Sequence, residues 1–153
     1  MAESPSLLGA YQRAHDLVIE SSLSEEEKAV VWMTTGVENG CSYTIQAHAF
    51  IALSKGVDQS VVEALAHQPG RLNTRLQALR EFTLEVINCR GRLSVTAVQD
   101  VLEAGFSKQN MLDVVLAVAQ KNMSTILNSI AGTEIDARFK WDAFQGLNTV
   151  SEA

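Results

Sequence analysis

The most constraining feature of this 153-residue sequence is the recurrence of apolar residues every three or four positions along most of its length. Residues 6–19, 74–88 and 107–132 show it most clearly. Because helical residues advance by about 100° each, this spacing puts the apolar side chains on one face of a helix. No segment alternates apolar and polar residues as a half-buried strand does. The pattern predicts an all-α fold.

Residues that begin and end helices divide this pattern into about six to seven helices. Ser24 followed by Glu27 forms a capping box, and Asp58 can cap a short helix. Helix ends are expected at Asn39-Gly40, Lys55-Gly56, Gly91, Gly105 and Gly132. Pro69-Gly70 is the clearest internal break, but either half alone is too small and too apolar to be stable. We therefore expect residues 1–153 to form one helical bundle, a single domain.

Charge and hydropathy exclude several classes of function. A net charge of −6 and a pI near 5.0 disfavour nucleic-acid binding, which needs clustered Lys and Arg. The longest apolar run, residues 114–119, is far short of the roughly 20 residues that a membrane span needs. The first residues lack the positive and apolar blocks of a secretory signal. These features predict a cytoplasmic protein without a membrane partner, and neither a metal nor a cofactor is expected.

Cys41 and His48 form the most informative pair of residues for function. Asn39-Gly40 breaks the preceding helix, so a new helix is expected to begin at Cys41. On that helix Thr44 lies about 60° from Cys41 and His48 about 20°, so the three share one face. Unpaired N–H groups and the helix dipole in the first turn favour a thiolate. The spacing is therefore typical of a nucleophile beside a proton carrier, although a small buried cysteine and a core histidine are the alternative.

Aromatic residues gather near the end of the chain, at Phe139, Trp141 and Phe144. They either fold back on the core of their own chain or dock on a neighbouring subunit, since aromatic anchors are typical of interface centres. The apolar composition, with 46% hydrophobic and 20% charged residues, also favours surface shared between subunits. We expect a homo-oligomer.

The order of these motifs resembles a known family. The matching residues are Leu23-Ser24 with its acidic cluster, Val37-Glu38-Asn39-Gly40-Cys41, Tyr43, Ala47-His48, Gly56-Val57, Leu76 to Phe82, Ala104-Gly105 and Ala131-Gly132-Thr133. The sequence resembles the carboxymuconolactone decarboxylase family, in particular its alkylhydroperoxidase D-like branch, over nearly the whole chain. The resemblance implies an all-helical fold, assembly as a homo-oligomer, commonly a trimer or hexamer, and a small-molecule substrate.

Two positions depart from the signature of that branch, which is Cys-x-x-Cys followed by a His four residues later, with a glutamate on the preceding helix. Cys41 and His48 match, but Thr44 stands at the second Cys position. Ala29 stands where many relatives carry the glutamate. Glu27 and Glu38 are the nearby acids, and Glu27 is the more readily explained as a helix-capping residue.

The resemblance implies an antioxidant role with one retained thiol. Cys41 would be oxidised by a peroxide, Thr44 would donate a hydrogen bond to its thiolate, and His48 would carry protons. An external thiol would then reduce the oxidised cysteine. Cys89 is the one internal substitute for the missing resolving cysteine, but a disulfide needs Cα atoms within roughly 7 Å, and we expect Cys89 to be structural or without a role.

Two other functions remain open. In a cofactor-free lyase resembling the decarboxylase branch, His48 with Glu27 or Glu38 would move protons on a small lactone acid. The carboxylate of that substrate would need a basic residue, and Arg75, Arg80 and Lys121 are available, although each is expected to be a solvated surface charge. The remaining possibility is a non-catalytic oligomer that keeps the fold without a complete site.

Overall fold

The computed structural model describes residues 3–67 and 72–140 of the chain. Within these ranges it holds seven α-helices and no strand, which confirms the predicted all-α fold. The elements are α1 (Pro5–Ile19), α2 (Glu25–Glu38), α3 (Ser42–Ser54), α4 (Gln59–Ala66), α5 (Thr74–Asn88), α6 (Val95–Glu103), α7 (Lys108–Ala131) and a short 3₁₀ helix, η1 (Ala137–Phe139). The predicted break at Pro69-Gly70, and Trp141 and Phe144, lie outside the described residues.

The ends of the helices follow the capping chemistry read from the sequence. Ser24 and Glu27 form the predicted capping box at the start of α2, with the Ser24 hydroxyl accepting from Glu27 N and the carboxylate accepting from Ser24 N. Ser107 and Asn110 form a second box at the start of α7. Gly132 ends α7 with φ of +57°, a left-handed conformation that glycine adopts without steric cost.

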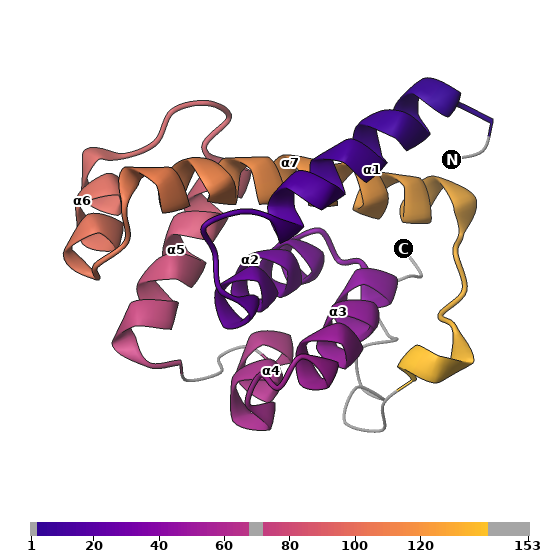
Figure 1. Ribbon diagram of the computed structural model, residues 1–153, viewed down its shortest axis with the longest axis horizontal. Helices are drawn as coiled ribbons and strands as arrows, with labels where there is room; N and C mark the ends of the chain where they lie inside the picture. Colours follow the sequence, from indigo (N-terminus) through magenta and orange to yellow (C-terminus); the bar gives the residue numbers. More distant parts are fainter. Residues whose placement is uncertain (1–2, 68–71, 141–153) are drawn as a thin grey trace.

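Helix α2 is the centre of the molecule. Residues 27–36 of this helix are all buried, and α2 packs against α3, α4, α5 and α7. A helix covered on all sides belongs in the core rather than on a surface. Figure 1 shows the long α7 running across the molecule, with α1 crossing it, α3 and α4 below, and α5 and α6 at the left. In this part of the chain no helix is both long enough and apolar enough to cross a bilayer.

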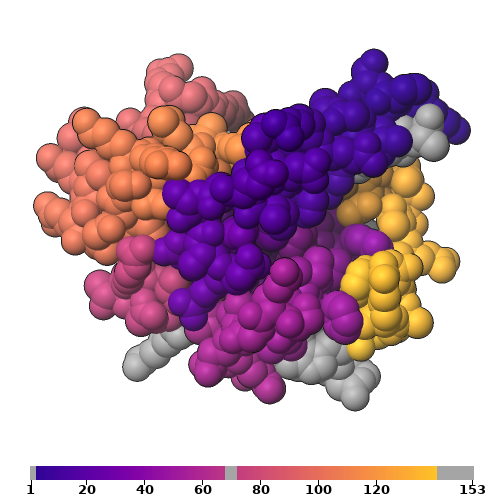
Figure 2. Space-filling view, in the orientation of Figure 1, coloured from indigo at the N-terminus to yellow at the C-terminus, as the bar shows by residue number. Residues whose placement is uncertain are grey.

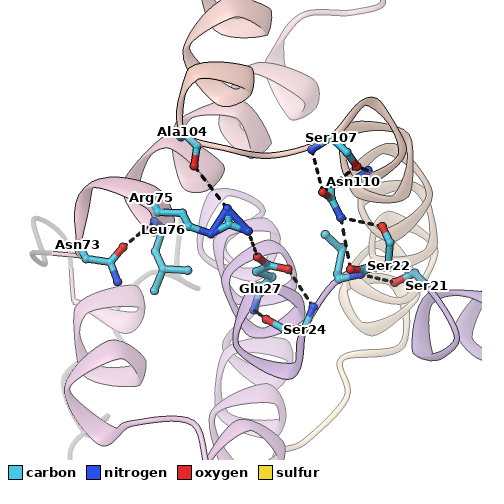
Figure 3. A network of polar contacts seen from close by, with 11 residues as sticks. Ser21, Ser22, Ser24, Glu27, Asn73, Arg75, Leu76, Ala104, Ser107 and Asn110 are labelled. Carbon is cyan, nitrogen blue, oxygen red and sulfur yellow. Dashed lines mark hydrogen bonds and ion pairs between the residues drawn. The ribbon is translucent and has the colours of Figure 1, made fainter.

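A partly buried ion pair joins α2 to α5 and to the loop before α7 (Figure 3). Glu27, only 7% exposed, pairs with Arg75, whose guanidinium also donates to Ala104 O and lies 3.7 Å from the ring centre of Phe106. Arg75 is half-exposed, but Arg80 is buried, so the expectation of a solvated surface charge is wrong for Arg80. Its position one turn after Leu76 on the buried face of α5 explains its burial.

Candidate functional site

Cys41 lies at the start of α3, as its position after Asn39-Gly40 predicts. It is the N-cap residue, with extended backbone dihedral angles (φ −97°, ψ 91°), and α3 itself begins at Ser42. The side chain is half-buried and its thiol is free. Thr44 Oγ1 donates a hydrogen bond to Cys41 Sγ at 3.2 Å, and Asn128 Nδ2 of α7 lies 3.8 Å from the same sulfur. Two polar donors and the N-terminal end of a helix therefore surround the thiol.

A glycine in α2 makes the position of Thr44 possible. A Cβ atom added at Gly36 would lie 2.8 Å from Thr44 Cγ2 and 3.2 Å from Thr44 Cβ, closer than packed carbon atoms approach. Gly36 O also accepts a hydrogen bond from Cys41 N at 2.9 Å. The backbone of α2 thus holds both the cysteine and its hydrogen-bond donor.

His48 lies two turns further along α3 and is only 7% exposed. Its Nε2 is 2.6 Å from Lys121 Nζ of α7, and its ring centre is 4.7 Å from that of Trp32. Burial, the nearby Lys121 and, to a smaller extent, His15 lower the pKa of His48 well below its usual value. The imidazole is consequently neutral at physiological pH.

Lys121 was named from the sequence only as one of three basic residues that a carboxylate substrate could use, and Asn128 was not named at all. Lys121 was expected on the surface, and this expectation is wrong, because the side chain is only 2% exposed. Burial lowers its pKa to about 7, while Cys41 acts in the opposite direction. Val114, Ala117 and Val118 are buried on the same face of α7 one and two turns earlier. This i, i+3, i+4, i+7 spacing places Lys121 on the buried face of the helix and could have predicted its burial. We expected an exposed side chain instead, because lysine is rarely buried.

These residues form two pairs between α3 and α7. Cys41 of α3 meets Asn128 of α7, and His48 of α3 meets Lys121 of α7. Each pair is seven residues from the other on both helices, about 10 Å along the axis. Thr44 lies between the pairs on α3. The structure therefore brings Cys41 and Thr44 into contact, and it places His48 at the other end of the same row.

A cavity of about 330 Å³ runs beside this row. In the part of the chain that the structure describes, its lining residues include no carboxylate and come from α1, α3, α7 and the segment after α7; they are Tyr11, His15, Tyr43, Thr44, Ala47, His48, Ile51, Lys121, Ser124, Asn128, Thr133 and Phe139. Its size is at the lower end of the range for small-molecule sites. Figure 2 shows α1 across this face and the yellow segment that contains η1 beside α3.

Phe139 closes one end of this region by folding back on its own chain. It is 8% exposed, and its ring lies 5.9 Å from that of Tyr43 and 5.5 Å from that of Phe50. Tyr43 also donates a hydrogen bond to Asp136 at 3.0 Å. Of the two interpretations of the aromatic tail, packing on the same chain is therefore the correct one for Phe139.

The two candidate acids have other partners. Both carboxylate oxygens of Glu27 are engaged by Arg75 and Ser24, and Glu38 accepts from Asn88 Nδ2 at 3.0 Å on the surface. Ala29, where the resemblance leads one to look for a glutamate, is buried near His48, and a void of about 10 Å³ lined by both residues is no larger than one water molecule. Among the described residues, no carboxylate contacts the imidazole.

Cys89 lies apart from this site. It is the C-cap of α5, its sulfur is free, and it accepts a hydrogen bond from Gly91 N at 3.3 Å. The sulfur of Cys41 instead has its contacts with α3 and α7. The structure thus contains two unpaired thiols in different surroundings.

Comparison with known proteins shows the fold. No protein-family model matches this sequence, and no curated protein sequence does. A solved structure from Ralstonia eutropha JMP134, an uncharacterised peroxidase-related protein with the alkylhydroperoxidase AhpD core, aligns with a TM-score of 0.82 at 20% identity, covering 90% of this chain and 75% of that one. A peroxidase-related protein from Silicibacter sp. TM1040 aligns with a TM-score of 0.77 at 18% identity, covering 86% and 71%.

A third solved structure, a protein of unknown function from Agrobacterium tumefaciens described as a candidate antioxidant defence protein AhpD, has a TM-score of 0.80 at 14% identity. The alignment covers 89% of this chain and 94% of that protein. The chain therefore has the all-helical AhpD-like fold. Identities of 14–20% establish the fold alone, so membership of the carboxymuconolactone decarboxylase family remains a prediction.

Proposed function

We propose that this protein is an AhpD-like peroxidase that uses the single thiol of Cys41 and an external thiol reductant. The observation that carries the proposal is the environment of Cys41 Sγ, which lies at the start of α3 and accepts a hydrogen bond from Thr44 Oγ1 at 3.2 Å. A helix N-terminus and a hydroxyl donor both favour the thiolate, the form that attacks a peroxide. The shared fold supports the same conclusion.

The first half of the reaction oxidises the thiol and reduces the peroxide. The Cys41 thiolate attacks one peroxide oxygen, an S–O bond forms, and the O–O bond breaks. The departing alkoxide takes a proton and leaves as an alcohol, or as water when the substrate is hydrogen peroxide. Lys121 and His48 line the cavity about 10 Å along the helix axis from Cys41 and supply a group that titrates near neutrality, so water in the cavity would carry the proton from them to the alkoxide.

The second half of the reaction needs a thiol from outside the chain. Thr44 cannot form a disulfide, and Cys89 lies at the end of α5. One external thiol condenses with the Cys41 sulfenic acid, releasing water and forming a mixed disulfide. A second thiol attacks this disulfide, which frees Cys41 and yields the oxidised reductant. The half-buried position of Cys41 leaves the sulfur accessible to such a reductant.

The test is a peroxide-consumption assay with dithiothreitol as reductant. We expect Cys41→Ser to abolish turnover and Cys89→Ser, the matched control, to leave it within about twofold, because only Cys41 has the activating environment. Circular dichroism checks that both variants are folded. If Cys41→Ser consumes peroxide as fast as the unmodified protein, the thiol mechanism fails, and the lyase and non-catalytic alternatives gain support.

A further inference from the structure

Lys121 is a buried amine without a carboxylate partner among the described residues. A buried ammonium is normally paired with an acid, because burial of an isolated charge is costly. Lys28 follows this rule: it is 4% exposed, lies 2.9 Å from Glu25 and donates to Ile19 O. Lys121 is buried to the same degree, but the partner of its Nζ is the neutral ring of His48.

The groups that face Lys121 do not hold a proton on it strongly. His48 on α3 and His15 on α1 are bases, and burial and Lys121 lower the pKa of both. Cys41 raises the pKa of Lys121 without offsetting the effect of burial, which brings it to about 7. Among the described residues that line the cavity, Tyr11 and Tyr43 are the other titratable groups. A substantial fraction of the amine is therefore neutral near pH 7.

The contact with His48 leaves the neutral amine able to react. The charged ammonium has only donors, so His48 Nε2 accepts from it at 2.6 Å. Loss of a different proton keeps this hydrogen bond and frees the lone pair of the nitrogen. Lys121 also lines the cavity of about 330 Å³, whose walls include Ala47, Ile51 and Phe139. A nucleophilic nitrogen thus borders a mainly apolar space large enough for a small organic molecule.

We propose that this cavity is a binding site for small, uncharged aldehydes or ketones, with which the amine of Lys121 forms an imine. A buried lysine with a lowered pKa is a typical nucleophile toward carbonyl carbon. Among the described residues, the cavity wall carries no charged group other than these bases, which favours an uncharged ligand. The reacting atom is Nζ of Lys121 rather than Sγ of Cys41, so formation of the imine does not require the thiol, although it would consume the amine that the proposed peroxidase reaction uses to carry protons.

The reaction is a condensation without a redox step. The lone pair of Lys121 Nζ attacks the carbonyl carbon, the C=O π bond breaks, and one of the two N–H protons moves to the carbonyl oxygen to give a neutral carbinolamine. Loss of the second N–H proton and of the hydroxyl as water forms the C=N bond. Both N–H protons of the amine thus leave with the carbonyl oxygen as water, and the hydrogen bond to His48 orients the nitrogen toward the cavity before the attack.

The test is reductive alkylation of the native full-length protein with propanal and cyanoborohydride at pH 7, followed by peptide mass spectrometry. We expect Lys121 to be modified at least about 10-fold faster than Lys28, the matched buried control, and than the exposed Lys55. A substantial fraction of the Lys121 amine is neutral at pH 7 because its pKa is lowered to about 7, and only the neutral amine attacks a carbonyl carbon. Comparable rates for Lys121 and Lys55 would overturn the proposal.

Two further measurements test whether Lys121 reacts inside the cavity and whether its reaction depends on the thiol of Cys41. A polycyclic aromatic aldehyde too large for the cavity should modify Lys55 while sparing Lys121; equal modification of both lysines would show that Lys121 reacts outside the cavity. Cys41→Ser should retain the modification of Lys121 by propanal, since Cys41 acts only to raise the pKa of that amine. Loss of modification in folded Cys41→Ser protein would contradict an independent amine site, whatever the peroxide assay shows.

Discussion

Lys121 Nζ lies 2.6 Å from His48 Nε2, and this contact joins α7 to α3 in the interior of the protein. Burial and Lys121 lower the pKa of the imidazole and keep it neutral. Burial also lowers the pKa of the Lys121 amine to about 7, close to physiological pH. Cys41 and Asn128 form the second contact between the same helices. The amine and the imidazole therefore line one cavity, and the thiol lies next to it, in contact with Thr44 and Asn128 of its wall.

The depressed pKa of Lys121 predicts a pH-dependent stability. Its folded pKa is about 7 and its ordinary value is 10.5, so between these values the unfolded chain binds more protons. Stability from this group therefore rises with pH across that window, by up to about 1.4 kcal/mol per pH unit. We expect Lys121→Met to be the more stable protein at pH 7 and to lose this advantage by pH 10. Urea unfolding of both proteins at several pH values measures the difference, and a constant difference would contradict the assigned burial of the charge.

Replacing Gly36 tests whether the packing of α2 against α3 positions the donor to Cys41. In Gly36→Ala the new methyl group meets Thr44 Cγ2 at 2.8 Å, so we expect a loss of about 1–3 kcal/mol in stability and slower alkylation of Cys41 by iodoacetamide. Thr44→Ser removes Cγ2 and retains the hydroxyl. The double variant should recover part of both losses. Slower alkylation that Thr44→Ser does not relieve would indicate a different cause.

Glu27 tests a structural role against a catalytic one. Its carboxylate bonds to Arg75 and caps α2, so Glu27→Gln should lower stability by about 1–2 kcal/mol, a figure reduced because Arg75 is half-exposed. The rate of peroxide consumption should stay unchanged at a temperature where the variant is folded. A large loss of rate without a loss of stability would show that Glu27 takes part in the reaction.

The homo-oligomer expected from the sequence remains a prediction, and α7 offers a surface for it. Leu112, Ile126 and Ile130 are 70%, 59% and 78% exposed. With Leu116, Ala119 and Met123 they follow the alternating four- and three-residue spacing of a coiled-coil seam, which two copies of one helix can share. We expect Ile126→Glu to lower the mass measured by light scattering, and Val95→Glu, at an exposed site on α6, to leave it unchanged. A monomeric unmodified protein would refute this assignment.

Local chemistry accounts for what the sequence could predict of the fold. Helix ends depend on a few neighbouring residues, so a single sequence is enough to predict them. Examples are the Ser24–Glu27 capping box, the break at Asn39-Gly40 and the left-handed Gly132. The contact between Cys41 and Thr44 was predictable for the same reason, because one helical turn separates them.

The remainder of the site depends on contacts between distant helices. Lys121 and Asn128 come to α3 from α7, about 80 residues later in the chain, and no local rule pairs them with His48 and Cys41. A lysine is also expected on the surface, because its ammonium is costly to bury. The sequence correctly placed His48 on the same helix face as Cys41. Only the packing of α7 against α3 shows that His48 Nε2 is in contact with Lys121 Nζ.

The central claim is that the sulfur of Cys41 is the atom that reacts with peroxide. Its most direct measurement is mass spectrometry of the unmodified protein treated with less than one equivalent of peroxide in the presence of dimedone, which traps sulfenic acids. The account predicts that dimedone is attached at Cys41 and that Cys89, the internal reference, stays unmodified. Labelling of Cys89 in preference to Cys41, or oxidation of neither thiol, would contradict it.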